Sequence, residues 1–147
     1  TIEDLDLLTA TRIEVLKAAN NLPSDVDMTV VKEQSYHYYK KAICDETHIA
    51  YFVFDGNHFA GTDGVSFFQV LPTYHNPSGK KAYIMNMYTA PAYRRCGVAY
   101  KTLDLLIKEI KGKGITAISL EATDMGRPLY EKYGFRKMDH EMELPEC

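Results

Sequence analysis

The residues best suited to chemistry form a short loop, Arg94-Arg95-Cys96-Gly97-Val98-Ala99, at the predicted start of a helix. The first N–H groups of a helix have no intrahelical partners, and the helix dipole favours an anion beside them. Gly97 lets the backbone approach an oxygen atom without a Cβ in the way, and the arginines add positive charge. The loop therefore predicts a phosphate site, although a Gly-x-Ala pattern by itself more often marks an ordinary helix start.

The distribution of charge supports a polyanion at this place. The 147 residues carry a net charge of −3, yet the stretch 80–114 has eight Lys or Arg against two acidic residues. A basic stretch within an acidic chain is typical of a local anion site, whereas general nucleic-acid binding usually requires a broadly basic domain. We therefore expect a cofactor phosphate and no nucleic-acid partner. Lys108, Lys111 and Lys113 are interpreted as a solvated helix face.

The cysteines and the apolar runs exclude other classes of protein. Cys44, Cys96 and Cys147 are too few and too scattered for a disulfide framework, and no Cys/His cluster indicates zinc, so we expect reduced thiols and no metal. Cys96 has no His nearby in the sequence and is interpreted as structural. The sequence has no apolar run long enough for a membrane span and no recognisable signal peptide, which predicts a soluble, cytoplasmic protein with no membrane partner.

The elements that position the loop follow from the apolar spacing. With 46% hydrophobic residues, the chain suits one compact domain, 1–147. The strand predicted before the loop, 82–88, has almost no polar residue except Asn86, so we expect this strand to be buried on both faces. Strand, helix and strand in succession predict a parallel pair. In chain order the pattern predicts a helix to residue 19, a helix over 28–43, a hairpin of strands over 51–54 and 59–71, a strand over 82–88, a helix over 99–110, a strand over 115–122, a helix over 129–133 and a final extended segment over 135–144.

Two segments in this order resemble the GNAT superfamily of N-acetyltransferases. Arg94-x-x-Gly97-x-Ala99, after a strand, is similar to the family's acetyl-CoA signature: Gln or Arg, two residues, Gly, one residue, then Gly or Ala. Downstream, Leu129-Tyr130-Glu131-Lys132-Tyr133-Gly134-Phe135 resembles the end of the family's fourth helix, Leu-Tyr-Glu-x-x-Gly-Phe. The resemblance covers residues 81–135 and makes acetyl-CoA the expected polyanion.

The resemblance implies an α/β (α+β) fold, a single domain whose mixed central sheet has two splayed parallel strands and is flanked by helices. In this sequence the splayed strands are 82–88 and 115–122, and the pantetheine arm of CoA would lie between them. The family's first strand, which normally precedes the first helix, has no counterpart here, so we expect the sequence to begin after it. The resemblance also leaves a homodimer open.

The resemblance further implies roles for individual residues. Backbone N–H groups near Met87 and Tyr88 would polarise the thioester carbonyl. Tyr130 matches the tyrosine that protonates the CoA sulfur in many relatives. The alternative interpretation is a buried tyrosine that only packs beside the cofactor. Thr123 stands where many relatives carry an Asn that contacts pantetheine, so Thr123 itself or Asp124 would replace that contact. The residues expected to bind the cofactor are Met87, Tyr88, Thr89, Arg94, Arg95, Cys96, Gly97, Val98, Ala99, Tyr100, Thr123 and Tyr130.

No motif specifies the general base. Many relatives place a Glu on the strand equivalent to 82–88, where this sequence has only Asn86, which cannot take up a proton. The catalytic candidates are Glu121, on the second splayed strand, and His75, in the loop 72–79; water is a third. The ordinary interpretation of Glu121 is a residue at a strand end that pairs with a cation, and that of His75 is a surface residue.

Two functions therefore remain open. The first is an N-acetyltransferase that passes the acetyl group of acetyl-CoA directly to a primary amine of a small molecule or protein. The second is a non-catalytic acyl-CoA sensor or interaction module, favoured by the missing Glu. A nucleotide-binding domain of another fold is disfavoured because neither GxGxxG nor GxxxxGK[ST] is present.

The acceptor of the acetyl group has no recognisable sequence code. Arg12 falls on the apolar stripe of the first helix, where a charge is costly unless the side chain snorkels or finds a partner. We expect snorkelling in preference to a substrate contact. The acceptor is expected against the first two helices and the loop 72–79, near Arg12, Tyr36, Tyr38 and His75.

Overall fold

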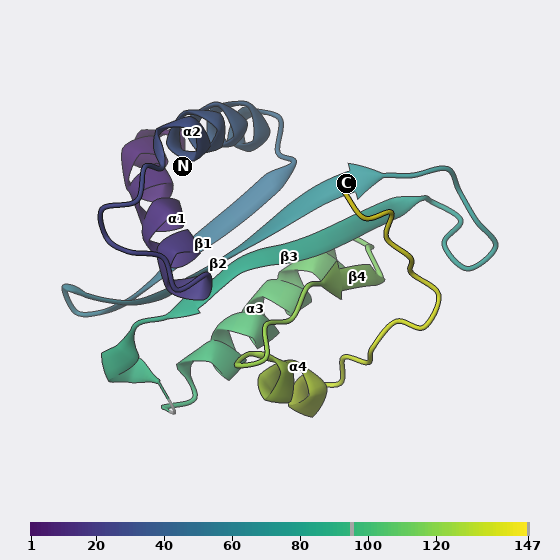
Figure 1. The fold of residues 1–147 in the computed structure, drawn as a ribbon. Helices are drawn as coiled ribbons and strands as arrows, with labels where there is room; N and C mark the ends of the chain where they lie inside the picture. The colour runs from purple at the N-terminus through teal and green to yellow at the C-terminus, as the bar shows by residue number, and fades with distance from the viewer. Residues whose placement is uncertain (95, 147) are drawn as a thin grey trace.

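The computed structural model describes residues 1–94 and 96–146. A four-stranded sheet in the order β1-β2-β3-β4 carries α1 and α2 on one face and α3 and α4 on the other (Figure 1). None of these four helices has the length and apolar character that a membrane span needs. The strands are β1 (His48–Asp55), β2 (His58–Gln69), β3 (Lys80–Thr89) and β4 (Ala117–Leu120). The helices are α1 (Leu5–Ala19), α2 (Thr29–Cys44), α3 (Val98–Gly112) and α4 (Arg127–Tyr133), with 3-10 turns at Ile2–Asp4 and Pro91–Tyr93.

The sheet combines antiparallel and parallel pairing, as the sequence predicted. β1 and β2 form a hairpin around the two-residue turn at Gly56 and Asn57, and β2 pairs antiparallel with β3. β3 pairs parallel with β4, and α3 is the helix that connects them. The βαβ unit is therefore confirmed, and β1 and β4 form the two edges of the sheet.

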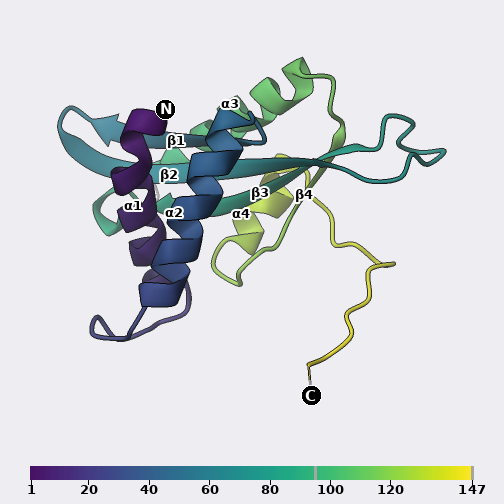
Figure 2. The same cartoon turned by 90° about the horizontal axis from the view of Figure 1, so that it is seen from above.

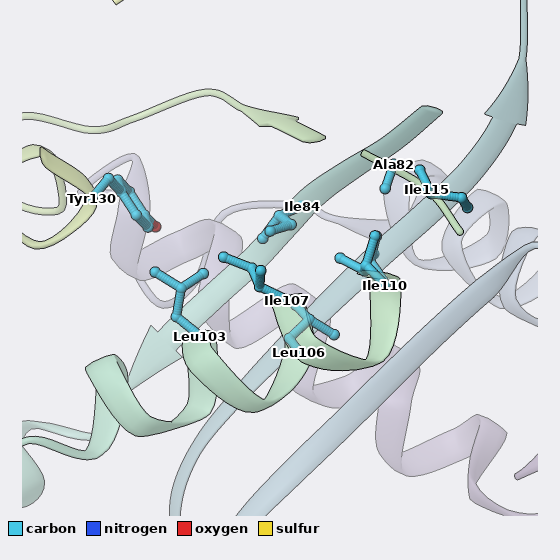
Figure 3. Close-up of a cluster of buried hydrophobic side chains, with 9 residues drawn as sticks. Ala82, Ile84, Leu103, Leu106, Ile107, Ile110, Ile115 and Tyr130 are labelled. Atoms are coloured by element: carbon cyan, nitrogen blue, oxygen red, sulfur yellow. The ribbon is translucent and has the colours of Figure 1, made fainter. Parts of the chain in front are cut away.

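Two clusters of buried side chains hold the layers together. The apolar positions of α3 recur at helical spacing and therefore face the sheet as one stripe (Figure 3). The larger cluster consists of Val65, Ala82, Ile84, Leu103, Leu106, Ile107, Ile110, Ile115 and Tyr130. The smaller cluster lies on the opposite face of the sheet, between α1 and α2, and consists of Leu5, Leu8 and Tyr39.

The structure corrects two expectations about the strands and describes the final segment. β4 is shorter than the predicted 115–122, because its pairing with β3 ends at Leu120. β3 is fully buried on one face only: Ala82 and Ile84 lie under α3, whereas Tyr83 is half-buried, because α1 and α2 cross only part of the other face (Figure 2). Residues 135–146 form neither helix nor strand.

β3 contains an irregularity close to the point where its pairing with β4 ends. Asp63 of β2 lies alone opposite both Asn86 and Met87, so β3 contains one extra residue, a β-bulge. Asn86 has a φ of 60°, in the left-handed region that Asn tolerates better than most residues. Pairing of β3 with β4 stops at Ile84, although β3 continues to Thr89. The two parallel strands are therefore paired only as far as Ile84, just before the bulge, in agreement with the predicted splay.

Candidate active site

A cleft of about 1180 Å³ opens where β3 and β4 separate. Its walls come from the end of β3, the start of α3, the β4–α4 turn with α4, and the C-terminal end of α1. Arg95 lies outside the described residues, and Cys96 is exposed without lining the cleft. The cleft brings together ten of the twelve residues predicted to bind the cofactor: Met87, Tyr88, Thr89, Arg94, Gly97, Val98, Ala99, Tyr100, Thr123 and Tyr130.

The start of α3 is built to receive an anion. α3 begins at Val98 without a side-chain cap, so the N–H groups of its first turn have no intrahelical partners. Gly97 has a φ of 78°, and a Cβ there would meet no atom within 4 Å, so the space beside the helix start is open. Arg94 Nε donates a hydrogen bond of 3.2 Å to the Thr89 carbonyl, which ties the loop to the end of β3. The free N–H groups and the guanidinium together fit a phosphate.

Tyr130 belongs to the wall of the cleft that α4 provides. Its side chain is buried, and its ring packs edge-on against Phe135 with 6.0 Å between the ring centroids. Gly126 makes room for this ring, since a Cβ at that position would come within 3.0 Å of it. Burial raises the pKa of the Tyr130 hydroxyl, so the phenol stays protonated and can donate a proton.

Thr123 and Asp124 belong to the turn that precedes α4. Thr123 Oγ1 accepts the Gly126 N–H at 3.1 Å, and its carbonyl accepts the Arg127 N–H at 2.9 Å. The Thr123 hydroxyl therefore stabilises the start of α4 while it lines the cleft. Within the described part of the chain, Asp124 is the one carboxylate of the lining. A contact of either residue with pantetheine remains a prediction.

Neither side chain predicted as a general base reaches the lining of the cleft. His75 lies in the β2–β3 loop, with its ring 5.3 Å from that of Tyr74. This loop precedes the first residue of β3, whereas the cleft lies at the last residues of the same strand. Glu121 is exposed just after β4. Burial, followed by the charge of Glu121, raises the pKa of Tyr83, which lies outside the cleft lining.

None of the four residues expected near the acceptor lines the cleft: Arg12, Tyr36, Tyr38 and His75 all lie outside its lining. Tyr38 does not line the cleft; its hydroxyl lies 3.0 Å from His48 Nδ1 and 2.6 Å from Ser66 Oγ. Burial, followed by the Arg12 charge, lowers the pKa of His48 to about 4, which keeps this ring neutral. The first helix was expected beside the acceptor, and α1 does line the cleft. It does so through the small and apolar residues Val15, Ala18 and Ala19, followed by Asn21, and not through Arg12.

Arg12 finds a polar partner, the second of the two possibilities that its place on the apolar stripe left open. It is half-buried, and its Nη1 donates a hydrogen bond of 3.0 Å to Oδ1 of Asn86, the residue at the bulge. The sequence holds a signal for this pair, because Arg12 and Asn86 are each an isolated polar residue in an apolar pattern. Nothing in the spacing, however, shows that two residues 74 positions apart meet.

The comparison with known proteins defines the class of protein. Residues 16–135 match the model of the acetyltransferase (GNAT) family, and the chain belongs to this family. The crystal structure of a predicted acetyltransferase with acetyl-CoA from Clostridium acetobutylicum is similar, with a TM-score of 0.89, 32% identity and coverage of 99% of this chain and 92% of that one. A GCN5-related N-acetyltransferase from Ralstonia eutropha shares the fold, with a TM-score of 0.84, 23% identity and coverage of 99% and 94%.

A curated relative matches over a shorter segment. The [ribosomal protein bS18]-alanine N-acetyltransferase of Haemophilus influenzae is 36% identical over 61 residues, which are 40% of this chain. The match spans 42% of that relative's length. These comparisons confirm the resemblance that the loop 94–99 and the helix ending at Phe135 indicated.

Proposed function

We propose that this chain is an N-acetyltransferase that passes the acetyl group of acetyl-CoA directly to a primary amine. The observation that carries the proposal is the cleft beside the unpaired end of β3. After its last pair with β4, at Ile84, β3 continues to Thr89, so one side of its backbone lacks a strand partner. The pantetheine arm contains amide groups that could replace such a partner. The acetyl-CoA in the Clostridium structure supports this assignment.

The cofactor's charged end would lie at the start of α3. The N–H groups of Val98 and Ala99 would donate to the pyrophosphate, and the Arg94 guanidinium would balance its charge. Acetyl-CoA supplies a thioester whose carbonyl carbon an amine can attack. The walls of the cleft would hold that thioester between β3 and Tyr130.

The reaction forms an N–C bond, breaks the C–S bond and moves two protons. Backbone N–H groups near Met87 and Tyr88 would stabilise the negative charge that develops on the carbonyl oxygen. Tyr130 would donate its proton to the departing sulfur, since phenol and alkyl thiol pKa values differ by about two units or less. The attacking amine would release its proton to water, because the cleft lining contains neither Glu121 nor His75.

A thiol-release assay over a panel of amines tests this function. The panel should include small amines, amino acids and a peptide that begins with Ala, because the name of the Haemophilus relative specifies an alanine acceptor. Tyr130→Phe should lower turnover on the best acceptor by about 100-fold, because it removes the proton donor and keeps the ring. Calorimetry should show that this variant still binds acetyl-CoA.

Tyr133→Phe is the matched control on the same helix. The Tyr133 hydroxyl donates a hydrogen bond of 2.7 Å to Asp104 and does not line the cleft, so its loss should leave turnover near that of the wild type. Full turnover by Tyr130→Phe would refute its role as the acid. If the wild type binds acetyl-CoA and no amine releases thiol, the chain is the acyl-CoA sensor instead. No binding at millimolar acetyl-CoA would defeat both functions.

A further inference from the structure

One hydrogen bond connects α1 to the bulge of β3. Within the described residues, Arg12 to Asn86 is the one side-chain hydrogen bond between the α1–α2 layer and β3; the others from that layer reach β1 and β2. No described carboxylate lies within 4.0 Å of the Arg12 guanidinium. The Asn86 amide is therefore the polar group that satisfies this half-buried cation.

The partner of Arg12 is also the residue with the unusual backbone. Asn86 is the one described non-glycine residue with a positive φ inside a strand; Asn21 and Glu46 have this conformation in loops. A left-handed residue persists where surrounding contacts hold it. The fixed Oδ1 of Asn86 is such a contact, because a rotation of this backbone would carry the side chain away from Arg12.

The bulge decides where the following peptide groups point. One extra residue in β3 changes the direction and phase of the strand, and Met87 and Tyr88 come next and line the cleft. Their N–H groups are those that the proposed function assigns to the thioester carbonyl. A donor displaced by about 1 Å from its productive position can lose much of its effect.

We propose that Arg12 is a positioning residue that holds Asn86 in the left-handed conformation and so aims the N–H groups after the bulge at the thioester carbonyl. The proposal rests on the proposed function and adds a role for α1 to it. Arg12 does not line the cleft and acts through Asn86. The alternative is a tether that only fastens α1 to the sheet, and that role would affect stability without affecting the carbonyl.

Infrared spectroscopy of acetyl-CoA labelled with carbon-13 at the acetyl carbonyl, bound to the full chain, separates these roles. In the wild type, the bound carbonyl band should lie below its frequency in solution, because aligned donors polarise the bond. Arg12→Met keeps the length of the side chain and removes the donor, so the band should move back toward the solution value. The turnover number should fall by about 10- to 100-fold, while the dissociation constant of acetyl-CoA changes by less than about threefold.

Two further variants and a control make the test specific. Arg12→Lys keeps a cationic donor and should restore part of the shift. Arg12→Met and Asn86→Ala should together lower turnover no more than the worse single variant, since both break one bond. Lys17→Met removes a cation from the same helix, where Lys17 donates to the Ser24 carbonyl, and should leave the band in place.

The outcomes distinguish this proposal from the function beneath it. A folded Arg12→Met variant with an unmoved band, or fully additive losses in the double variant, overturns the positioning role. Bound acetyl-CoA with no carbonyl shift in the wild type overturns it as well and leaves cofactor binding intact. Absence of binding in calorimetry defeats the proposed function itself, and the positioning role with it.

Discussion

At the scale of a single residue, Asp63 is a carboxyl group that the fold buries without a hydrogen-bond partner among the described residues. It lies on β2, and its side chain is fully buried. Because desolvation disfavours the charged form, burial raises the pKa of Asp63 from 3.8 to about 7. The folded protein therefore keeps Asp63 neutral at a pH where the unfolded chain has already released the proton.

This shift predicts a pH dependence of stability with a definite sign. Below pH 3.8 both states are protonated and Asp63 has no net effect; between 3.8 and about 7 the unfolded state is increasingly favoured. Asp63→Asn keeps the shape and removes the ionisation, so it should stabilise the fold by about 2–3 kcal/mol more at pH 8 than at pH 5. Denaturant unfolding at the two pH values measures this difference.

Asp25→Asn provides the control, because Asp25 is exposed in the loop between α1 and α2. A surface substitution of this kind should change the free energy of unfolding by less than about 0.5 kcal/mol at either pH. Equal effects of Asp63→Asn at pH 5 and pH 8 would mean that the Asp63 carboxyl ionises as readily in the folded chain as in the unfolded one.

At the scale of an element, the residues that flank the two ends of α3 both adopt the left-handed backbone conformation. Gly97 before the helix and Gly114 after it have φ values of 78° and 80°, and a Cβ at either would meet no atom within 4 Å. Replacement by Ala should therefore cost about 1–2 kcal/mol at each position through the left-handed conformation alone. Only Gly97 adjoins the N–H groups proposed to bind pyrophosphate.

The pair Gly97→Ala and Gly114→Ala separates stability from binding. Both variants should unfold at lower denaturant concentration by similar amounts, whereas calorimetry should show weaker acetyl-CoA binding for Gly97→Ala only. A weakening of roughly tenfold is expected if the added methyl group keeps a phosphate oxygen from the N–H groups. Equal affinities of the two variants would place the phosphate elsewhere.

The elements differ in how much of them the sequence could predict. α3 and α4 carry local signals, the apolar spacing and the glycines at 97 and 134, so their places in the site were predicted. The bulge at Asn86 depends on the register of two strands, which no local pattern specifies. Asp63 was missed as well, because no local pattern shows that this carboxyl is buried in the fold. His75 was a poor candidate because it lies at the wrong end of β3.

At the scale of the whole molecule, the cleft is lined by helices from both faces of the sheet, and each face has its own cluster of buried side chains. The end of α1 lies on one face of the sheet and α3 and α4 on the other, and all three line the cleft. A ligand that contacts these walls is bound only when they are assembled. Acetyl-CoA should therefore stabilise the complete fold by mass action.

Thermal unfolding measures this linkage. At a free acetyl-CoA concentration 100 times its dissociation constant, the stabilisation is about 2.7 kcal/mol, which should raise the melting temperature of a domain of this size by roughly 10 °C. Gly97→Ala should need a higher acetyl-CoA concentration for the same rise, and Gly114→Ala should not. ATP shares the polyphosphate and adenine but has no pantetheine arm, so it should stabilise much less at an equal concentration. An equal rise with ATP would show that the start of α3 binds polyphosphate without help from the separated strands, and would remove the main support for the acetyl-CoA assignment.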